Sequence, residues 1–337
     1  MEPDYTQTRS MYDVIFEHFG VRKQEEAASL MYRDRGAPPL PASNYSKLKL
    51  PYEAASHPGI PTISEFTQGM KDNRLSSKFA QHPEAENLLF LQEHSQVRVP
   101  KLYAVFTGPE GEHYIVTEFI EGDSYDGDDK EKWGRLTEDA RTKICSKIAE
   151  QFRLLRSVPG EGYYGRVHNQ GWHGWQSMFR LGSRKPKGPF NTYNEFVSAI
   201  LKTIEFQTAF RHFDKEFFDP DEVAFLPVAR RFLATSSRGH EPKLTHADPA
   251  LWNMRIRKVI QKDGAEDWEV TFIDWAEMGW YPAWMQSVMI QLKIYWRRAA
   301  PERKDVIRNV LEGIGDDYSE YVEFFEELKG TLQFSVP

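Results

Sequence analysis

Four polar side chains between positions 246 and 274 have the types and spacing needed to bind a hard metal ion and to move a proton. His246 and Asp248 stand two apart, and Asn253 follows the aspartate by five positions. Asp274 ends an apolar alternation that a turn at positions 263–264 folds back as a β-hairpin. The hairpin would return Asp274 to Asn253, where a carboxylate and an amide oxygen suit Mg²⁺. Asp248 would then face the metal as the group that orients a hydroxyl and accepts its proton.

The string 246–248, the later Asn253 and the closing string 273–275 resemble the aminoglycoside phosphotransferase and choline kinase-like family. That family usually has glycine before and leucine after its catalytic aspartate. This chain has Ala247 and Pro249 there, and neither departure removes a functional side chain. A buried aspartate at a strand end and a helix-capping histidine are each common alone, but their joint spacing around a hairpin favours the kinase-like interpretation.

The resemblance implies an α+β, two-lobed protein-kinase-like fold with a small β-rich N-lobe and a mostly helical C-lobe. It implies ATP and Mg²⁺ as cofactors, with His246 and Asp248 as catalytic residues and Asn253 and Asp274 as metal ligands. The expected activity is phosphorylation of a hydroxyl on a small-molecule substrate, but the substrate itself does not follow from the family.

The residues expected to hold the nucleotide lie upstream of this string. The segment 113–120 resembles the family's hinge strand, whose backbone holds adenine, and this implicates Glu118 and Ile120. A lysine on an apolar strand should position the phosphates. The best candidate is Lys78, with Glu84 on the following helix as its ion-pair partner, and Lys71 competes for the role. Two serines before Lys78 make a poor buried strand, so the small lobe is predicted to be divergent.

The composition indicates a folded globular chain without a nucleic-acid or membrane partner. Of its 337 residues, 40% are hydrophobic and 14% aromatic, which is enough for a substantial core. A net charge of −7 provides no basic surface for nucleic acid or an anionic bilayer. No apolar run has the length of a membrane span, and a single cysteine, Cys145, excludes an internal disulfide. We therefore expect a cytoplasmic protein; the oligomeric state does not follow from the sequence.

The chain divides into three predicted segments. Residues 1–61 should form a helical arm and a Pro/Ser-rich linker, the linker running from Gly36 to Pro61. Residues 62–120 should form the small nucleotide-binding lobe, and residues 121–337 the large helical lobe with the catalytic loop and the hairpin. Within the large lobe Thr137 should cap a long helix. The string 188–190 before the next helix resembles the fungal branch of the family.

Two further patterns compete for function. The glycine-rich run 160–165 is spelled like a phosphate loop, but it follows a helix and lies after the hinge, so we expect an ordinary loop. An acidic run after the hinge is more often a solvated loop than a site, yet it could attract a cationic substrate. Its members are Glu121, Asp123, Asp126, Asp128 and Asp129.

Two hypotheses of function follow. The first is an ATP-dependent small-molecule kinase that uses the residues above. The second is a pseudokinase that binds nucleotide weakly or serves as a scaffold, which the divergent region around Lys78 favours. The intact Asp248, Asn253 and Asp274 favour the enzyme.

Overall fold

The computed structural model describes residues 11–23, 25–27, 29–30, 46–60, 62, 64–65, 68, 82–108, 113–125, 130–172, 187–211, 220–294 and 301–331. Its helices are α1 (Met11–Phe19), α4 (His82–His94), α5 (Lys130–Gly134), α6 (Glu138–Arg156), α7 (Tyr193–Arg211), α8 (Pro220–Thr235), α9 (Met285–Ile294), α10 (Pro301–Ile314) and α11 (Ser319–Thr331), with a 3₁₀ turn η3 (Leu251–Asn253). Its strands are β1 (Tyr52–Glu53), β2 (Leu102–Thr107), β3 (His113–Thr117), β4 (Pro242–Thr245), β5 (Met254–Ile260), β6 (Glu266–Phe272) and β7 (Gly279–Pro282). The lysines predicted to bind phosphate, Lys71 and Lys78, lie outside these ranges.

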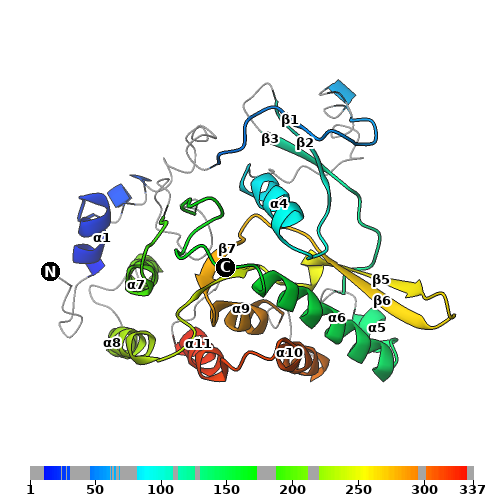
Figure 1. Ribbon diagram of the computed structural model, residues 1–337. Coiled ribbons are helices and arrows are strands. Elements are labelled where there is room, and N and C mark those ends of the chain that lie inside the picture. Colours follow the sequence, from blue (N-terminus) through cyan, green and yellow to red (C-terminus); the bar gives the residue numbers. More distant parts are fainter. Residues whose placement is uncertain are drawn as a thin grey trace.

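A small antiparallel sheet, ordered β1-β2-β3, lies above α4 (Figure 1). In α4, Leu88 and Leu91 lie three positions apart, so both face the core and are almost completely buried. The predicted linker is wrong at one point, because Tyr52 and Glu53 pair with Val105 and Ala104 as strand β1. A two-residue strand is held by its partner, and no local pattern in the sequence marks it.

The hairpin β5–β6 has the predicted alternation. Met254 and Ile256 of β5 pair with Phe272 and Val270 of β6, and all four side chains are buried. They pack on α6, where the ring of Phe152 lies 4.7 Å from that of Phe272. The register of the hairpin therefore fixes where β6 ends and where Asp274 follows.

Helix α6 begins at the predicted cap. The Thr137 hydroxyl accepts a hydrogen bond from the Ala140 N–H, and the helix buries Ile144, Ile148 and Phe152 against the hairpin. These three side chains recur every four positions and so lie on one face of the helix.

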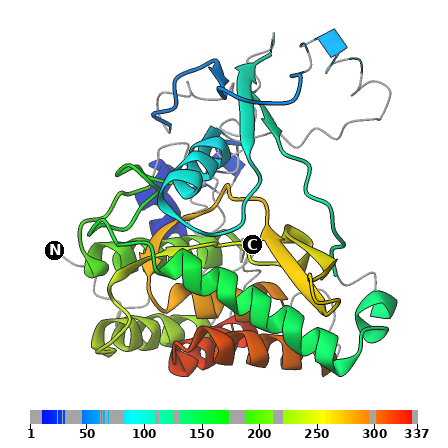
Figure 2. The same ribbon diagram turned by 45° about the vertical axis from the view of Figure 1, so that its right-hand side comes forward.

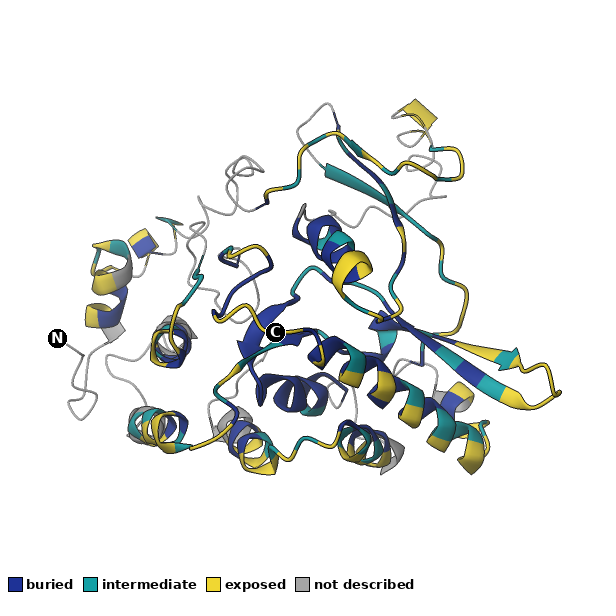
Figure 3. Ribbon diagram, viewed as in Figure 1, coloured by how far each residue is buried: buried dark blue, intermediate teal, exposed yellow. Residues whose placement is uncertain are grey.

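The lower part of the molecule is helical and encloses α9 (Figures 1 and 3). Every residue of α9 except Gln291 is buried, as expected for a helix that other elements surround. An aromatic core holds it, including Trp284, which stacks on Tyr321 at 4.8 Å. At the other end of the chain, α1 packs on α7.

The α+β class is confirmed, with a small sheet and α4 on one side of the hairpin and the helices on the other (Figure 2). The boundaries at residues 61 and 120 stay predictions. Among the described residues, no helix is both long enough and apolar enough to cross a bilayer.

Candidate active site

A backbone hydrogen bond joins the predicted catalytic loop, residues 246–253, to the end of the hairpin. Asn253 ends the turn η3 immediately before β5, and its carbonyl accepts the N–H of Ile273 at 2.9 Å. Asp274 is the next residue, so the hairpin delivers it beside Asn253 as the sequence predicts. The loop brings Asp248 to the same place through the side chain of Asn253.

The amide of Asn253 fits a metal ligand. Its Nδ2 donates to the backbone oxygen of Asp248 at 3.0 Å and to Asp248 Oδ2 at 2.9 Å, which commits the nitrogen end of the amide. Its Oδ1 is buried and accepts no hydrogen bond from any described residue. A buried acceptor without a donor is rare, and a hard cation satisfies it.

Asp274 has a strained backbone that its neighbours hold. Its φ of 63° lies in the left-handed region, which costs a non-glycine residue about 1–3 kcal/mol. On one side Ile273 is bonded to Asn253. On the other, the Trp275 N–H donates to Glu84 Oε1 at 3.4 Å and the Trp275 carbonyl accepts from Asn87 Nδ2 at 2.7 Å. The conformation is therefore imposed by the hairpin and by α4 together.

His246 is engaged at both ring nitrogens. Nδ1 accepts the N–H of Asp248 at 3.2 Å, and Nε2–H donates to the carbonyl of Ile273 at 3.1 Å. Burial lowers the pKa of His246, which favours this neutral ring. The histidine therefore joins the catalytic loop to the end of β6, and neither nitrogen is open to a reactant.

Two residues of α9 complete the site, and the sequence analysis missed both. Gln286 accepts from the His246 N–H at 3.0 Å and donates to the His246 carbonyl at 3.2 Å. The ammonium of Lys293 lies 3.5 Å from Asp248 Oδ1. Their signal in the sequence is polarity, since Gln286 and Lys293 interrupt an otherwise largely apolar helix.

The predicted nucleotide residues lie on α4 and in the hinge. Glu84 reaches the site by its bond to Trp275, while its predicted partner Lys78 is outside the described residues. The N–H of Glu118 donates to the carbonyl of Lys101 at 2.8 Å, so that N–H cannot bind adenine. No described residue hydrogen-bonds the backbone of Ile120. The adenine role of Glu118 and Ile120 stays a prediction.

A cavity of about 940 Å³ opens beside the hinge, away from the catalytic loop. It is bounded by residues 118–121, by Arg255 and Thr271 on the hairpin, and by the C-terminal end of α4 from Leu91. Asp274 is held at the other end of α4, through Glu84 and Asn87. Within the described ranges, no group of three or more His, Cys, Asp or Glu side chains is placed to hold a metal ion.

Where the glycine-rich run 160–165 pairs with β7, its backbone N–H groups donate to protein carbonyls and are not available to bind phosphate. The N–H groups of Tyr164, Gly165 and Arg166 donate to protein carbonyls, those of Phe190, Trp280 and Gln170. Its C-terminal neighbour Arg166 is completely buried and donates to Glu86 of α4 at 2.9 Å. The segment is thus a structural link between α4 and β7.

The acidic run after the hinge is partly neutralised. Glu121 lies 3.6 Å from Arg257, and Asp123 lies 3.1 Å from Lys132. The remaining acids, at 126, 128 and 129, are outside the described residues. The described part of the run therefore gives little support to a cationic substrate.

Comparison with known proteins identifies one family. The model of the phosphotransferase enzyme family matches residues 70–324. No curated protein matches the chain. Among solved structures, the gentamicin–APH(2″)-IIa complex is similar at 14% identity and a TM-score of 0.45, over 75% of this chain and 72% of that one.

Proposed function

The chain belongs to the phosphotransferase enzyme family, and from this premise we propose that it is an ATP-dependent kinase that phosphorylates a hydroxyl of a small molecule. The observation that carries the proposal is Asn253, whose nitrogen is committed to Asp248 while its buried oxygen has no donor among the described residues. A scaffold without catalysis has no use for this costly arrangement.

In this proposal the residues divide the work by position. Asn253 and Asp274 would hold Mg²⁺, which when bound neutralises charge on the phosphate oxygens. Asp248 orients the acceptor hydroxyl and accepts its proton through its carboxylate, which a hydrogen bond from Asn253 to Oδ2 holds in place. His246 is a positioning residue, since the backbone engages both of its nitrogens.

The nucleotide would lie between the lobes. Its adenine would meet the hinge at Glu118 and Ile120, and Lys78 with Glu84 would position its phosphates, as the family resemblance implies. Cytoplasmic location and membership of the fungal branch stay predictions. The acceptor is a small molecule whose charge is open, because the described acids after the hinge are paired.

The proposal is tested by replacing Asp248 with asparagine. With water as acceptor, ATP·Mg²⁺ hydrolysis at saturation should fall by about 10²–10⁴, because the group that takes the proton is lost. The dissociation constant for ATP·Mg²⁺ should stay within about a factor of three, below 1.4 kcal/mol. Asp123→Asn, which alters an exposed aspartate paired with Lys132, is the matched control and should behave like wild type.

Two outcomes would contradict the proposal. Wild-type turnover in Asp248→Asn would remove this residue from the mechanism. A wild-type protein that neither binds nor hydrolyses ATP·Mg²⁺ would favour the pseudokinase.

A further inference from the structure

Lys293 is a buried lysine beside the proposed catalytic aspartate. Its side chain is 7% exposed, and it is the only lysine that is buried among the described residues. It stands in α9, which packs on α10 and α11 and is coloured as buried in Figure 3. Burying an ammonium is costly unless a negative group compensates it, and Asp248 Oδ1 lies 3.5 Å away.

The two oxygens of Asp248 have different neighbours. Oδ2 accepts from Asn253 at 2.9 Å. Oδ1 is buried and accepts no hydrogen bond from a described residue, and the ammonium of Lys293 lies 3.5 Å from it. The ion pair at 3.5 Å holds the buried Oδ1 and the hydrogen bond from Asn253 holds Oδ2, so the carboxylate is fixed at both oxygens.

The catalytic loop itself supplies no cation. Residues 246–253 contain neither lysine nor arginine. His246 uses both ring nitrogens for backbone hydrogen bonds, one as acceptor, so its ring is neutral. Phosphoryl transfer depends on charges placed in advance, so a cation from another element has an evident use here.

We propose that Lys293 is a positioning residue for phosphoryl transfer: its ammonium, together with the amide of Asn253, holds the Asp248 carboxylate in the orientation that receives the acceptor hydroxyl. The inference rests on the proposed function. In the step, the acceptor oxygen bonds to the γ-phosphorus and the bond from that phosphorus to the departing ADP oxygen breaks. The acceptor proton passes to the Asp248 carboxylate and is later released to solvent.

The first test is kinetic, with ATP·Mg²⁺ hydrolysis by water as the probe reaction. Lys293→Met keeps the length of the side chain and removes its charge. It should lower saturated turnover at least about tenfold, while ATP·Mg²⁺ affinity stays within about threefold. Lys293→Arg keeps the charge and should recover most of that loss. Lys132→Met breaks an exposed lysine–aspartate pair elsewhere, at Asp123, and should have wild-type turnover.

The second test needs no nucleotide. Melting temperatures of Lys293→Met, Asp248→Asn and the double variant form a cycle with wild type. Coupled residues should give shifts that differ from additivity by about 2 °C or more. Lys293→Gln serves as the neutral variant if Lys293→Met does not fold.

The outcomes distinguish a failure of the role assigned to Lys293 from a failure of the proposed kinase function. If wild type hydrolyses ATP and Lys293→Met does so equally fast, or if the cycle is additive, the role of Lys293 is wrong while the proposed function stands. If Lys293→Arg loses as much turnover as Lys293→Met, charge is not what matters and the inference is overturned. If wild type neither binds nor hydrolyses ATP·Mg²⁺, the proposed function fails and takes this inference with it.

Discussion

The side chain at position 253 shows why an amide suits this place better than a carboxylate. Asn253 donates two hydrogen bonds to Asp248 and still presents a buried oxygen. An aspartate there could donate nothing and would place a second negative charge against Asp248. The amide therefore fixes the proposed base and presents an oxygen to the proposed metal ion without repelling Asp248.

Asp274 combines two effects that substitutions can separate, namely backbone strain and metal binding. Asp274→Ala and Asp274→Gly both remove the carboxylate, so both should lower Mg²⁺-dependent nucleotide affinity by about tenfold or more. The φ of 63° is unfavourable for alanine but not for glycine. The glycine variant should therefore be the more stable by about 1 kcal/mol, measured by urea unfolding.

Nucleotide binding without Mg²⁺ is the control for this pair of variants and should change little. Mg²⁺-dependent affinity that survives in both would mean that the hairpin does not make Asp274 a ligand. Equal stabilities would contradict the assigned strain.

At the scale of elements, α4 links the site to the rest of the fold. Asn87 holds the carbonyl of Trp275, and Glu86 forms a buried ion pair with Arg166 at the end of the glycine-rich run. That run in turn pairs with β7 through Gly165 and Trp280. The glycine-rich run 160–165 therefore has a structural role: it connects β7 to α4, the helix that holds Trp275 beside the site.

Gly165→Ala tests this structural role. A Cβ at position 165 would lie 2.6 Å from the carbonyl oxygen of Gln170 and 3.0 Å from Pro189 Cβ, too close without backbone movement. Stability should fall by about 1–3 kcal/mol, while ATP affinity of the folded variant stays within about threefold. Gly134→Ala, where a Cβ meets nothing within 4 Å, is the control. A hundredfold loss of affinity in folded Gly165→Ala would place the phosphate site here.

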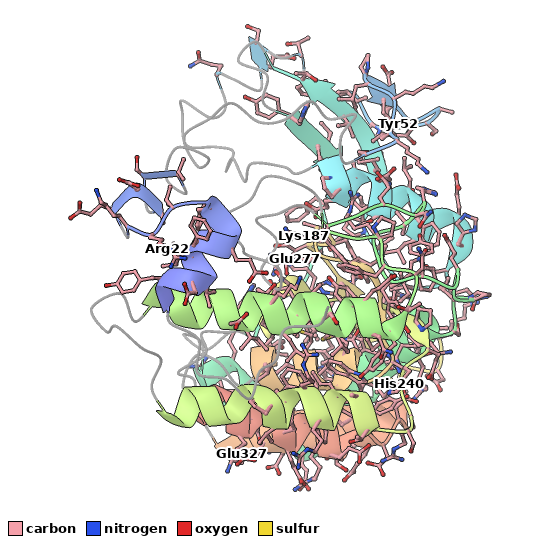
Figure 4. All side chains as sticks on the ribbon, turned by 90° about the vertical axis from the view of Figure 1, so that its left-hand side faces the viewer. Arg22, Tyr52, Lys187, His240, Glu277 and Glu327 are labelled. Carbon is pink, nitrogen blue, oxygen red and sulfur yellow. The ribbon has the colours of Figure 1, made fainter. Side chains whose placement is uncertain are left out.

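His240 should make the stability of the native protein depend on pH. His240 is labelled in Figure 4. Its ring stacks on that of Tyr193 of α7 at 3.7 Å, and its Nε2 is buried without a partner among the described residues. Desolvation lowers its pKa below the ordinary 6.5. As pH falls through 6.5, the unfolded chain therefore binds a proton before the native protein does, and stability is lost.

His240→Phe keeps a ring for the stacking and removes the titration. The melting temperature of wild type minus that of His240→Phe should therefore decrease between about pH 8 and pH 5. A difference that stays constant over this range would show that the native protein accommodates the charged ring.

The sequence predicts the parts of the site that are formed by residues close together in the chain. The hairpin follows from alternating apolar residues around a turn, so the proximity of Asn253 and Asp274 follows from the sequence alone. The roles of Gln286 and Lys293 do not, because these residues reach His246 and Asp248 from a helix about forty positions later in the chain. A buried helix is apolar all round and carries no periodicity that says which face meets the loop.

At the scale of the whole molecule, the small sheet and the helical part meet across the hinge and α4 (Figure 2). The described residues include the proposed base Asp248 and the proposed metal ligands Asn253 and Asp274, which are joined to α9 and α4. Lys78, the proposed phosphate-binding lysine, lies outside the described residues, so ATP binding has to be measured on the entire protein.

That property is stabilisation by ATP·Mg²⁺. At about 100 times its dissociation constant, a ligand that binds only the native state adds about 2.7 kcal/mol. At roughly 2–4 °C per kcal/mol, this is a shift of several degrees in melting temperature. Lys78→Met should remove most of the shift, because it deletes the charge assigned to the phosphates, whereas Lys71→Met should leave it unchanged. If the shift survives in Lys78→Met but is lost in Lys71→Met, then Lys71 and not Lys78 is the lysine that binds the phosphates. If wild type shows no shift at millimolar ATP·Mg²⁺, this chain is a pseudokinase.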